Sequence, residues 1–178
     1  MLKIGDKFPQ FNLVSVTGSD HTKDFTNVTL DTYAKNWKII FFWPKDFTFV
    51  CPTEITGFGK LNSEFLDRDA VLIGASTDSE FVHAAWRKHH VDLATLTFPW
   101  LADIKKELAG NLGILDTNSG VANRATFIVD PENIIRYVEM TDMSVGRNPQ
   151  ETLRILDALQ TDELCPCNWQ KNDATISV

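Results

Sequence analysis

The residue of this chain best placed for nucleophilic chemistry is Cys51, in the segment PKDFTFVCPTE over residues 44–54. It follows a continuous apolar run and begins an amphipathic pattern typical of a helix. The unpaired N–H groups and positive dipole end at a helix N-terminus stabilise a thiolate, which is the nucleophilic form of cysteine. Pro52 suits the first helical turn, where a missing N–H costs little. This placement predicts a reactive sulfur, whereas a lone cysteine is more often buried packing.

Two residues upstream of Cys51 have types that suit such a site. Thr48 lies three residues before the cysteine, where its hydroxyl could donate to an oxygen that approaches the sulfur, or could only cap the helix. Pro44 could shield the sulfur from water, or could only end the preceding strand. Each residue alone is a weak signal, but the spacing Pro-x-x-x-Thr-x-x-Cys after an apolar strand is specific.

The segment DFTFVCPTE over residues 46–54 resembles the active-site signature of the two-cysteine, AhpC-type branch of the peroxiredoxin family. The resemblance spans nearly the whole chain. It implies a thioredoxin-like fold and a thiol-dependent peroxidase in which Cys51 reacts with hydrogen peroxide and organic hydroperoxides. By the same resemblance, Pro44, Thr48 and Arg124 complete the peroxide pocket. Without it, Arg124 would be interpreted as a solvated charge at a strand edge.

Three further residues are expected to support this pocket. A guanidinium is always charged and offers several donors, so an arginine favours a nearby thiolate and polarises an O–O bond. Arg147 resembles a second arginine that the family places near the site. Glu54 and Trp86 are expected to buttress the pocket, although a tryptophan on the apolar face of a helix is more often plain core.

The tail ELCPCNW over residues 163–169 supplies the other two cysteines, Cys165 and Cys167. A sulfenic acid must return to the thiol before another turnover, and condensation with a second thiol is a protected route. Glu-Leu-Cys before Trp resembles the resolving segment of the family. The resemblance implies a disulfide between Cys51 of one subunit and Cys165 of its partner, in a homodimer that assembles into rings. Such a bond requires Cα atoms within ~7 Å, so the helix that begins at Cys51 must open locally.

Cys167 departs from the commonest family pattern. The Cys-x-Cys spacing resembles a smaller bacterial group of the family. Members of that group can be reduced by a helical partner, alkyl hydroperoxidase D, rather than by thioredoxin or a flavoprotein reductase. Cys167 is therefore either a relay or alternative resolving thiol, or a bystander, and both interpretations stay open.

Other chemistries fit the sequence less well. A thiol-disulfide oxidoreductase needs Cys-x-x-Cys, but the fourth position of that motif here is Glu54. A zinc site would need unusual ligand spacing, so we predict no metal and no cofactor. The candidate zinc ligands are Cys165, Cys167, His83, His89 and His90. The histidines are expected to be solvated on a charged helix. A non-enzymatic alternative is an oligomeric holdase-type chaperone or a peroxide sensor on the same fold.

The elements that must position these residues follow from apolar patterning. Short apolar runs predict strands, and two of the segments are hairpins. The expected strands are Phe11–Val16 paired with the segment around Phe25, Lys38–Trp43, Ala70–Ala75, and Ala125–Val129 paired with Ile134–Val138. Four helices are expected: one from Thr53 through Leu66, one capped by Asp78 with Phe81, Val82, Ala85 and Trp86 on its apolar face, one over Ile104–Leu108 ending near Gly110, and one opened by Pro149. This order predicts an α/β fold with a mixed central sheet flanked by helices, an N-terminal hairpin and a C-terminal tail.

The composition excludes several classes of function. The net charge of −7 argues against nucleic acid and against an anionic membrane surface as partners. No apolar run approaches the ~20 residues of a membrane helix, and the first residues lack the pattern of a signal peptide. We therefore expect a cytoplasmic protein with one domain over residues 1–160 and a tail over residues 161–178.

Overall fold

The computed structural model describes residues 1–20 and 22–177. Its centre is a mixed seven-stranded sheet in the order β2-β1-β5-β4-β3-β8-β9, and β6 and β7 form a separate ladder. The strands are β1 (Asn12–Val16), β2 (Phe25–Thr29), β3 (Trp37–Phe42), β4 (Ala70–Ser76), β5 (Trp100–Ala102), β6 (Leu115–Asp116), β7 (Val121–Ala122), β8 (Arg124–Val129) and β9 (Ile135–Thr141). The helices are η1 (Leu30–Tyr33), α1 (Cys51–Lys60), α2 (Asn62–Leu66), α3 (Glu80–His89), α4 (Glu107–Leu112) and α5 (Pro149–Gln160).

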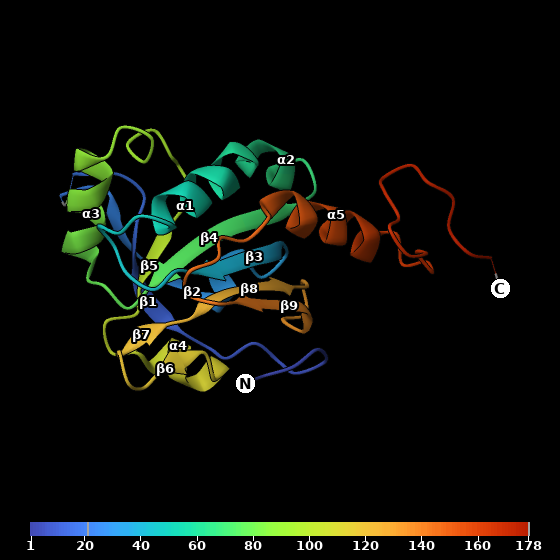
Figure 1. The fold of residues 1–178 in the computed structure, drawn as a ribbon, viewed down its shortest axis with the longest axis horizontal. Coiled ribbons are helices and arrows are strands. Elements are labelled where there is room, and N and C mark those ends of the chain that lie inside the picture. Colours follow the sequence, from blue (N-terminus) through green and yellow to red (C-terminus); the bar gives the residue numbers. More distant parts are fainter. Residues whose placement is uncertain (21, 178) are drawn as a thin grey trace.

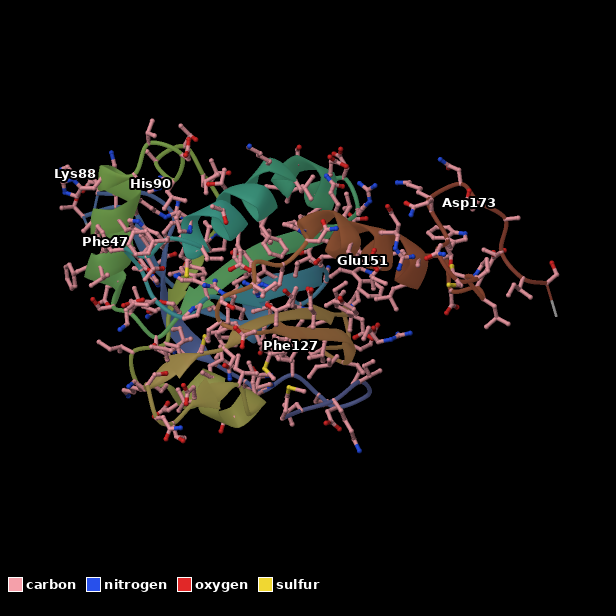
Figure 2. All side chains as sticks on the ribbon, in the orientation of Figure 1. Phe47, Lys88, His90, Phe127, Glu151 and Asp173 are labelled. Carbon is pink, nitrogen blue, oxygen red and sulfur yellow. The ribbon has the colours of Figure 1, made fainter. Side chains whose placement is uncertain are left out.

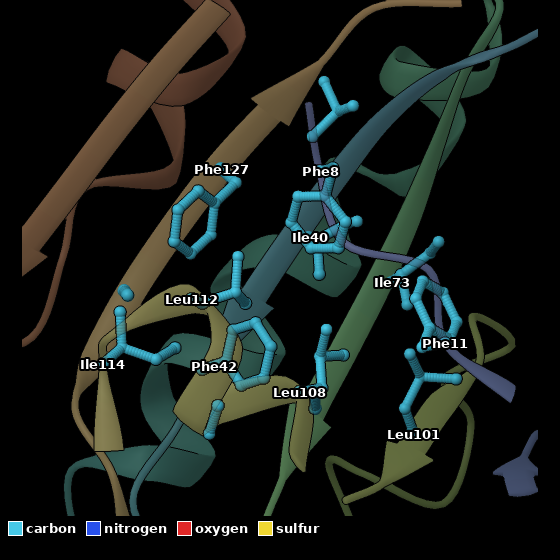
Figure 3. Packing of buried hydrophobic residues seen from close by; sticks show 14 of the residues in the cluster. Phe8, Phe11, Ile40, Phe42, Ile73, Leu101, Leu108, Leu112, Ile114 and Phe127 are labelled. Carbon is cyan, nitrogen blue, oxygen red and sulfur yellow. The ribbon is translucent and has the colours of Figure 1, made fainter. Parts of the chain in front are cut away.

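Both faces of the sheet are covered. Helices α1, α2, α3 and α5 lie on one face, and α4 with the N-terminal segment lies on the other (Figure 1). Because side chains alternate along a strand, β3 sends Ile39 and Phe41 into a first core, on the face covered by α1 and α5. It sends Ile40 and Phe42 into a second core, on the face covered by α4. Figure 3 shows this second core, where Phe42 lies among Leu112 and other side chains of the cluster. The continuous apolar run of β3 is thus explained by burial on both faces.

The pairing of the central strands positions the segment around Cys51. β3 runs parallel to β4, with Phe42 opposite Ala75, and antiparallel to β8, with Phe41 opposite Thr126. The end of β3 therefore lies beside the start of β8, which is Arg124. The chain leaves β3 at this edge and returns at Cys51, the first residue of α1.

The strands and hairpins expected from the sequence are confirmed. β1 pairs with β2 and β8 pairs with β9, both antiparallel, and β3 and β4 occupy the expected apolar runs. The sequence interpretation missed β5, which has only the residues Trp100–Ala102 and joins β1 to β4. A strand so short carries no periodicity, and it is defined by its neighbours rather than by its own pattern.

Two expected helices were placed incorrectly. The single helix predicted through Leu66 is interrupted at Leu61, so that α1 and α2 are separate helices. The helix predicted over Ile104–Leu108 begins three residues later, because Lys106 takes a left-handed conformation before the first turn. It also runs past Gly110 and ends at Leu112, and the next residue, Gly113, has a φ of 71°, the left-handed geometry common after a helix.

The predicted face of α3 also needs correction. Ser79 rather than Asp78 caps this helix, since the Ser79 side chain accepts from the backbone N–H of Val82. Phe81 was assigned to the buried face but is 61% exposed. Arg87 is buried instead. Its guanidinium donates to the backbone carbonyls of Thr17, Leu96 and Phe98 and lies 3.9 Å from the centre of a Trp100 ring.

The chain after α5 forms an extended tail that projects from the body of the molecule (Figure 1). An isolated bridge joins Leu164 to Ile176, and the buried ring of Trp169 donates to the carbonyl of Asp173. Arg154 of α5 donates to the Trp169 carbonyl and so ties the tail to the helix. Within the two described stretches of chain, no helix has the length and apolar character to span a membrane.

Candidate active site

Cys51 is the first residue of α1 and is 1% exposed. The preceding residue, Val50, contributes no side-chain cap, but its carbonyl accepts from the backbone N–H groups of Thr53 and Glu54 in the first turn. The sulfur belongs to the same buried cluster as Trp43, Phe58 and Trp86. A buried anion in such surroundings requires a positive partner.

Arg124 is that partner. Its Nη1 donates to Cys51 Sγ at 3.3 Å and also to Glu54 Oε2 on the next turn of α1. Its Nε donates to the carbonyl of Met143 at 2.8 Å, which fixes the plane of the guanidinium. Arg124 is 4% exposed, so its charge acts on the sulfur through protein rather than through water.

Glu54 joins Arg124 to a second arginine. Its Oε1 accepts from the backbone N–H of Arg147 at 2.9 Å and from Arg147 Nε at 2.8 Å. Burial by itself raises the pKa of Glu54, but the hydrogen bonds and charge of Arg147, with the charge of Arg124, hold that pKa below its usual value. Glu54 is therefore a carboxylate near neutral pH.

The formal charges of this cluster place a positive group beside the sulfur. Arg124 and Arg147 carry +2 and Glu54 carries −1. Glu139, half-buried on β9, also interacts electrostatically with Arg147. The guanidinium in contact with the sulfur is that of Arg124, and a positive group beside a cysteine favours the nucleophilic thiolate.

Arg147 supports the cluster without touching the sulfur. Its Nη1 donates to the carbonyl of Ala125 at 2.6 Å and to Thr126 Oγ1 at 3.2 Å, both on β8. Its guanidinium carbon also lies 5.8 Å from the centre of the Phe58 ring on α1. Arg147 therefore links β8, α1 and the loop before α5.

The two residues expected upstream are less directly engaged. Thr48 is half-buried, and its hydroxyl donates at 2.8 Å to the carbonyl of Lys45 within the same loop. Pro44 is half-buried and follows Trp43 at the end of the central strand. Both residues lie in the loop that leads to Cys51, but the hydrogen bond to the Lys45 carbonyl keeps the Thr48 hydroxyl within the loop.

Trp86 lies on α3 and is 2% exposed. Its ring centre is 5.8 Å from that of Phe47, in the loop before Cys51, and 6.0 Å from that of Trp100. The residue is thus part of the core beneath that loop. Figure 2 shows Phe47 beside α3, in agreement with this contact.

One pair of buried residues was not identified from the sequence. His83 was expected to be solvated, but it is completely buried and lies 2.7 Å from the carboxylate of Asp46. His89 is exposed and His90 half-buried, so only part of that expectation holds. The charged residues around His83 suggested a polar helix, while its partner is far away along the chain. A buried Asp–His pair leaves no local sequence signal.

The tail cysteines have different environments. Cys165 is half-buried, and its sulfur lies 3.5 Å from Thr161 Oγ1 and 3.8 Å from the carbonyl of Ala158 at the end of α5. Cys167 is exposed. All the cysteines are free in this structure. Over residues 1–20 and 22–177, no group of three or more His, Cys, Asp and Glu side chains is arranged to hold a metal ion.

The fold agrees with that of known proteins. The chain superimposes on AhpC of Mycobacterium bovis with a TM-score of 0.87 and 54% identity, over 96% of this chain and 99% of the other. It superimposes on a reduced 2-Cys peroxiredoxin of Plasmodium vivax with a TM-score of 0.90 and 32% identity, over 97% and 91%. The fold is therefore the thioredoxin-like fold of the peroxiredoxins.

Sequence comparison defines the family more narrowly. A model of the AhpC/TSA family matches residues 4–138. The alkyl hydroperoxide reductase C of Mycolicibacterium smegmatis is 56% identical over 99% of this chain and 94% of the relative. The chain belongs to the AhpC/TSA family.

Proposed function

We propose that this chain is a thiol-dependent peroxidase that reduces hydrogen peroxide and organic hydroperoxides through Cys51. The observation that carries the proposal is the contact of Arg124 Nη1 with Cys51 Sγ at the N-terminus of α1. Membership of a family whose relatives are named alkyl hydroperoxide reductase supports the same reaction. The cytoplasm is the compartment that we propose, because its reducing conditions keep the cysteines free.

The first step is a two-electron oxidation of the cysteine. The Cys51 thiolate attacks one peroxide oxygen, an S–O bond forms and the O–O bond breaks. The leaving alkoxide, or hydroxide for hydrogen peroxide, takes up a proton and departs as alcohol or water. Arg124 is positioned to stabilise the negative charge that moves from sulfur to the leaving oxygen.

The loop before Cys51 completes the pocket in this proposal. Pro44 shields the sulfur from bulk water, and the hydroxyl of Thr48 donates to the bound peroxide once it exchanges its partner in the loop, the Lys45 carbonyl. Glu54 and Arg147 act through Arg124 by holding its guanidinium in place. Trp86 supports the underside of the loop through its contact with Phe47.

The second step regenerates the enzyme through a disulfide. The thiolate of Cys165 from a second copy of the chain attacks the sulfenic sulfur of Cys51, the S–S bond forms, and the S–O bond breaks with release of water. The tail and the N-terminal end of α1 lie at opposite ends of one subunit (Figure 1), which supports resolution between copies in a homodimer. We propose that these dimers assemble into a ring.

A reductant protein then restores both thiols by disulfide exchange. Alkyl hydroperoxidase D, thioredoxin and a flavoprotein reductase are the proposed alternatives. Cys167 is the exposed cysteine of the tail and is therefore a suitable relay to that protein. Unchanged reduction rates in Cys167→Ser with every reductant would make this residue a bystander.

Non-reducing electrophoresis with mass mapping after peroxide tests these assignments. Wild type is expected to form a disulfide-linked dimer, and Cys51→Ser and Cys165→Ser are expected to lose it. Cys167→Ser is expected to keep the dimer. If Cys165→Ser keeps the dimer while Cys167→Ser loses it, the two tail cysteines exchange roles.

A non-catalytic role as holdase-type chaperone or peroxide sensor is not favoured, because the relatives are named as reductases. The two classes differ in turnover. Addition of excess peroxide and reductant to wild type is expected to give many catalytic cycles. Consumption of one peroxide per Cys51 followed by arrest in the presence of every reductant would support sensing instead.

A further inference from the structure

A second polar cluster lies beside the first but shares none of its residues. The side chains of Asp46 and His83 are both completely buried, and the distance from Asp46 Oδ2 to His83 Nδ1 is 2.7 Å. Asp46 Oδ1 accepts from Trp43 Nε1 at 2.7 Å, and His83 Nε2 lies 3.2 Å from the Leu101 carbonyl. Asp46 belongs to the loop over residues 43–50 between β3 and α1, whereas His83 belongs to α3 and Leu101 to β5.

Both ring nitrogens of His83 have a polar partner in the interior. His83 Nδ1 faces the Asp46 carboxylate and His83 Nε2 faces the Leu101 carbonyl. Burial raises the pKa of Asp46, and the charge of His83 opposes that rise. The nearby charged groups are Asp78 and Arg87, of opposite sign.

The backbone of the same loop is held as well. The N–H of Asp46 donates to Asp78 Oδ2 at 2.9 Å, and that carboxylate also accepts from Ser76 Oγ at 2.8 Å. The next residue, Phe47, has a φ of 55°, a left-handed conformation that costs free energy in a residue with a side chain. The hydrogen bonds of Asp46 thus hold the loop next to Phe47, the residue whose backbone is strained.

We propose that the Asp46–His83 pair is a positioning latch for the loop over residues 43–50. The latch holds Pro44, Thr48 and the start of α1 in the arrangement that meets peroxide. It also opposes the local opening that Cys51 needs, because a sulfur 1% exposed must leave the core before a second chain can reach it. This inference rests on the proposed peroxidase function.

A latch of this kind affects the two half-reactions in opposite directions. Loss of the latch lowers the fraction of loops arranged for peroxide, which slows oxidation of Cys51. The same loss raises the fraction of open loops, which speeds disulfide formation. A residue that contributed only to global stability would leave both rates alone while the protein stayed folded.

Variants at Asp46 separate hydrogen bonding from charge. Asp46→Ala removes both bonds, and the oxidation rate constant is expected to fall about tenfold while disulfide formation speeds up about tenfold. In Asp46→Asn the amide oxygen can accept from Trp43 Nε1 and the amide nitrogen can donate to His83 Nδ1, so both rates should stay within about threefold of wild type. His83→Ala breaks the same contact from the other side and replaces Asp46→Ala if that variant does not fold.

Asp103→Ala is the matched control. Asp103 is an equally buried aspartate, but it accepts from the backbone N–H groups of Leu108 and Ala109 at the start of α4. Its loss is expected to lower stability and leave both rate constants unchanged. Single-turnover rapid mixing with peroxide resolves the oxidation and disulfide steps as separate phases.

Three outcomes are distinguishable. Opposite changes in the two rates for Asp46→Ala or His83→Ala, restored in Asp46→Asn, support the latch. Rates that match the Asp103→Ala control, or that fall together, overturn it. If wild type itself shows no oxidation at Cys51, the proposed function fails rather than the latch.

Discussion

Among the single side chains, Glu54 determines the balance of charge around Cys51. It binds Arg124 with one carboxylate oxygen and Arg147 with the other, and all of these side chains are buried. Because Glu54 holds both guanidinium groups, it fixes the position of Arg124 against the sulfur. The role proposed for Cys51 therefore depends on the whole cluster.

Substitution of Arg124 tests the direct partner of the sulfur. Arg124→Gln keeps a donor but removes the charge, so the second-order rate constant for peroxide is expected to fall by about 10²-fold. Arg136→Gln is the control, because its side chain is 41% exposed and pairs with Asp130 away from Cys51. An unchanged rate constant in Arg124→Gln would contradict the role given to this guanidinium.

The lowered pKa of Glu54 has a consequence for stability in acid. The folded state favours the carboxylate, so near and below the ordinary glutamate pKa of 4.5 the unfolded chain binds a proton more readily than the folded chain does. The stabilisation is therefore complete above that value and is lost as the pH falls through it toward the lower pKa of the folded state. Urea unfolding at a series of pH values should show this loss in wild type.

Glu54→Gln is the matching variant. At pH 7 its free energy of unfolding should be lower than that of wild type by about 3 kcal/mol, because two buried guanidinium groups lose their carboxylate. Its stability should also depend less on pH between about 5 and 3 than that of wild type. If the free energy of unfolding of Glu54→Gln falls as steeply with decreasing pH as that of wild type, Glu54 is not the titrating group.

At the level of secondary structure, β4 packs closely against Trp43, the residue that follows β3 on the way to Cys51. Gly74 of β4 lies under the ring of Trp43, where an added Cβ would stand 2.7 Å from a ring carbon. Gly74→Ala is therefore expected to destabilise the protein by about 1–3 kcal/mol through overpacking. The measurement is urea unfolding of Gly74→Ala and wild type at one pH.

Gly110→Ala is the control for that substitution. Gly110 lies inside α4 and has no atom within 4 Å of an added Cβ. Because alanine is the better helix former, this variant should gain about 0.5–1 kcal/mol. If Gly74→Ala is as stable as wild type, or gains stability as Gly110→Ala is expected to, the packing account is contradicted.

The elements that sequence predicts well are those defined by local patterns. The apolar run of β3 and the position of Cys51 at a helix start follow from nearby residues alone. The strand β5, the break at Leu61 and the burial of His83 depend on neighbours from other parts of the chain. The contact between Arg124 and Cys51 was expected only through family resemblance, because it joins residues far apart in sequence.

For the whole molecule, the separation of the two reacting segments is the main feature. Phe47, in the loop before Cys51, and Asp173, in the tail, lie at opposite ends of the molecule (Figure 2). Resolution between copies therefore predicts complementation when the variants Cys51→Ser and Cys165→Ser are mixed, both with Cys167→Ser. After subunit exchange and peroxide, the mixture should form a disulfide-linked dimer that neither variant forms alone.

A covalent dimer confined to one variant, or an intrachain disulfide in a wild-type monomer, would contradict this arrangement. Electrophoresis without reductant, with the two variants carrying tags of different mass, separates the possibilities. The expected product contains one copy of each tag.

The most direct test of the account is chemical trapping of the oxidised sulfur. In a Cys165→Ser, Cys167→Ser variant, the sulfenic acid cannot be resolved by either tail cysteine, so it should persist long enough to react with a sulfenic-acid-specific carbon nucleophile. Mass spectrometry after one equivalent of peroxide is predicted to find the adduct on Cys51. Full consumption of the peroxide with Cys51 still a thiol would contradict the central claim that this residue is the peroxide-reacting cysteine.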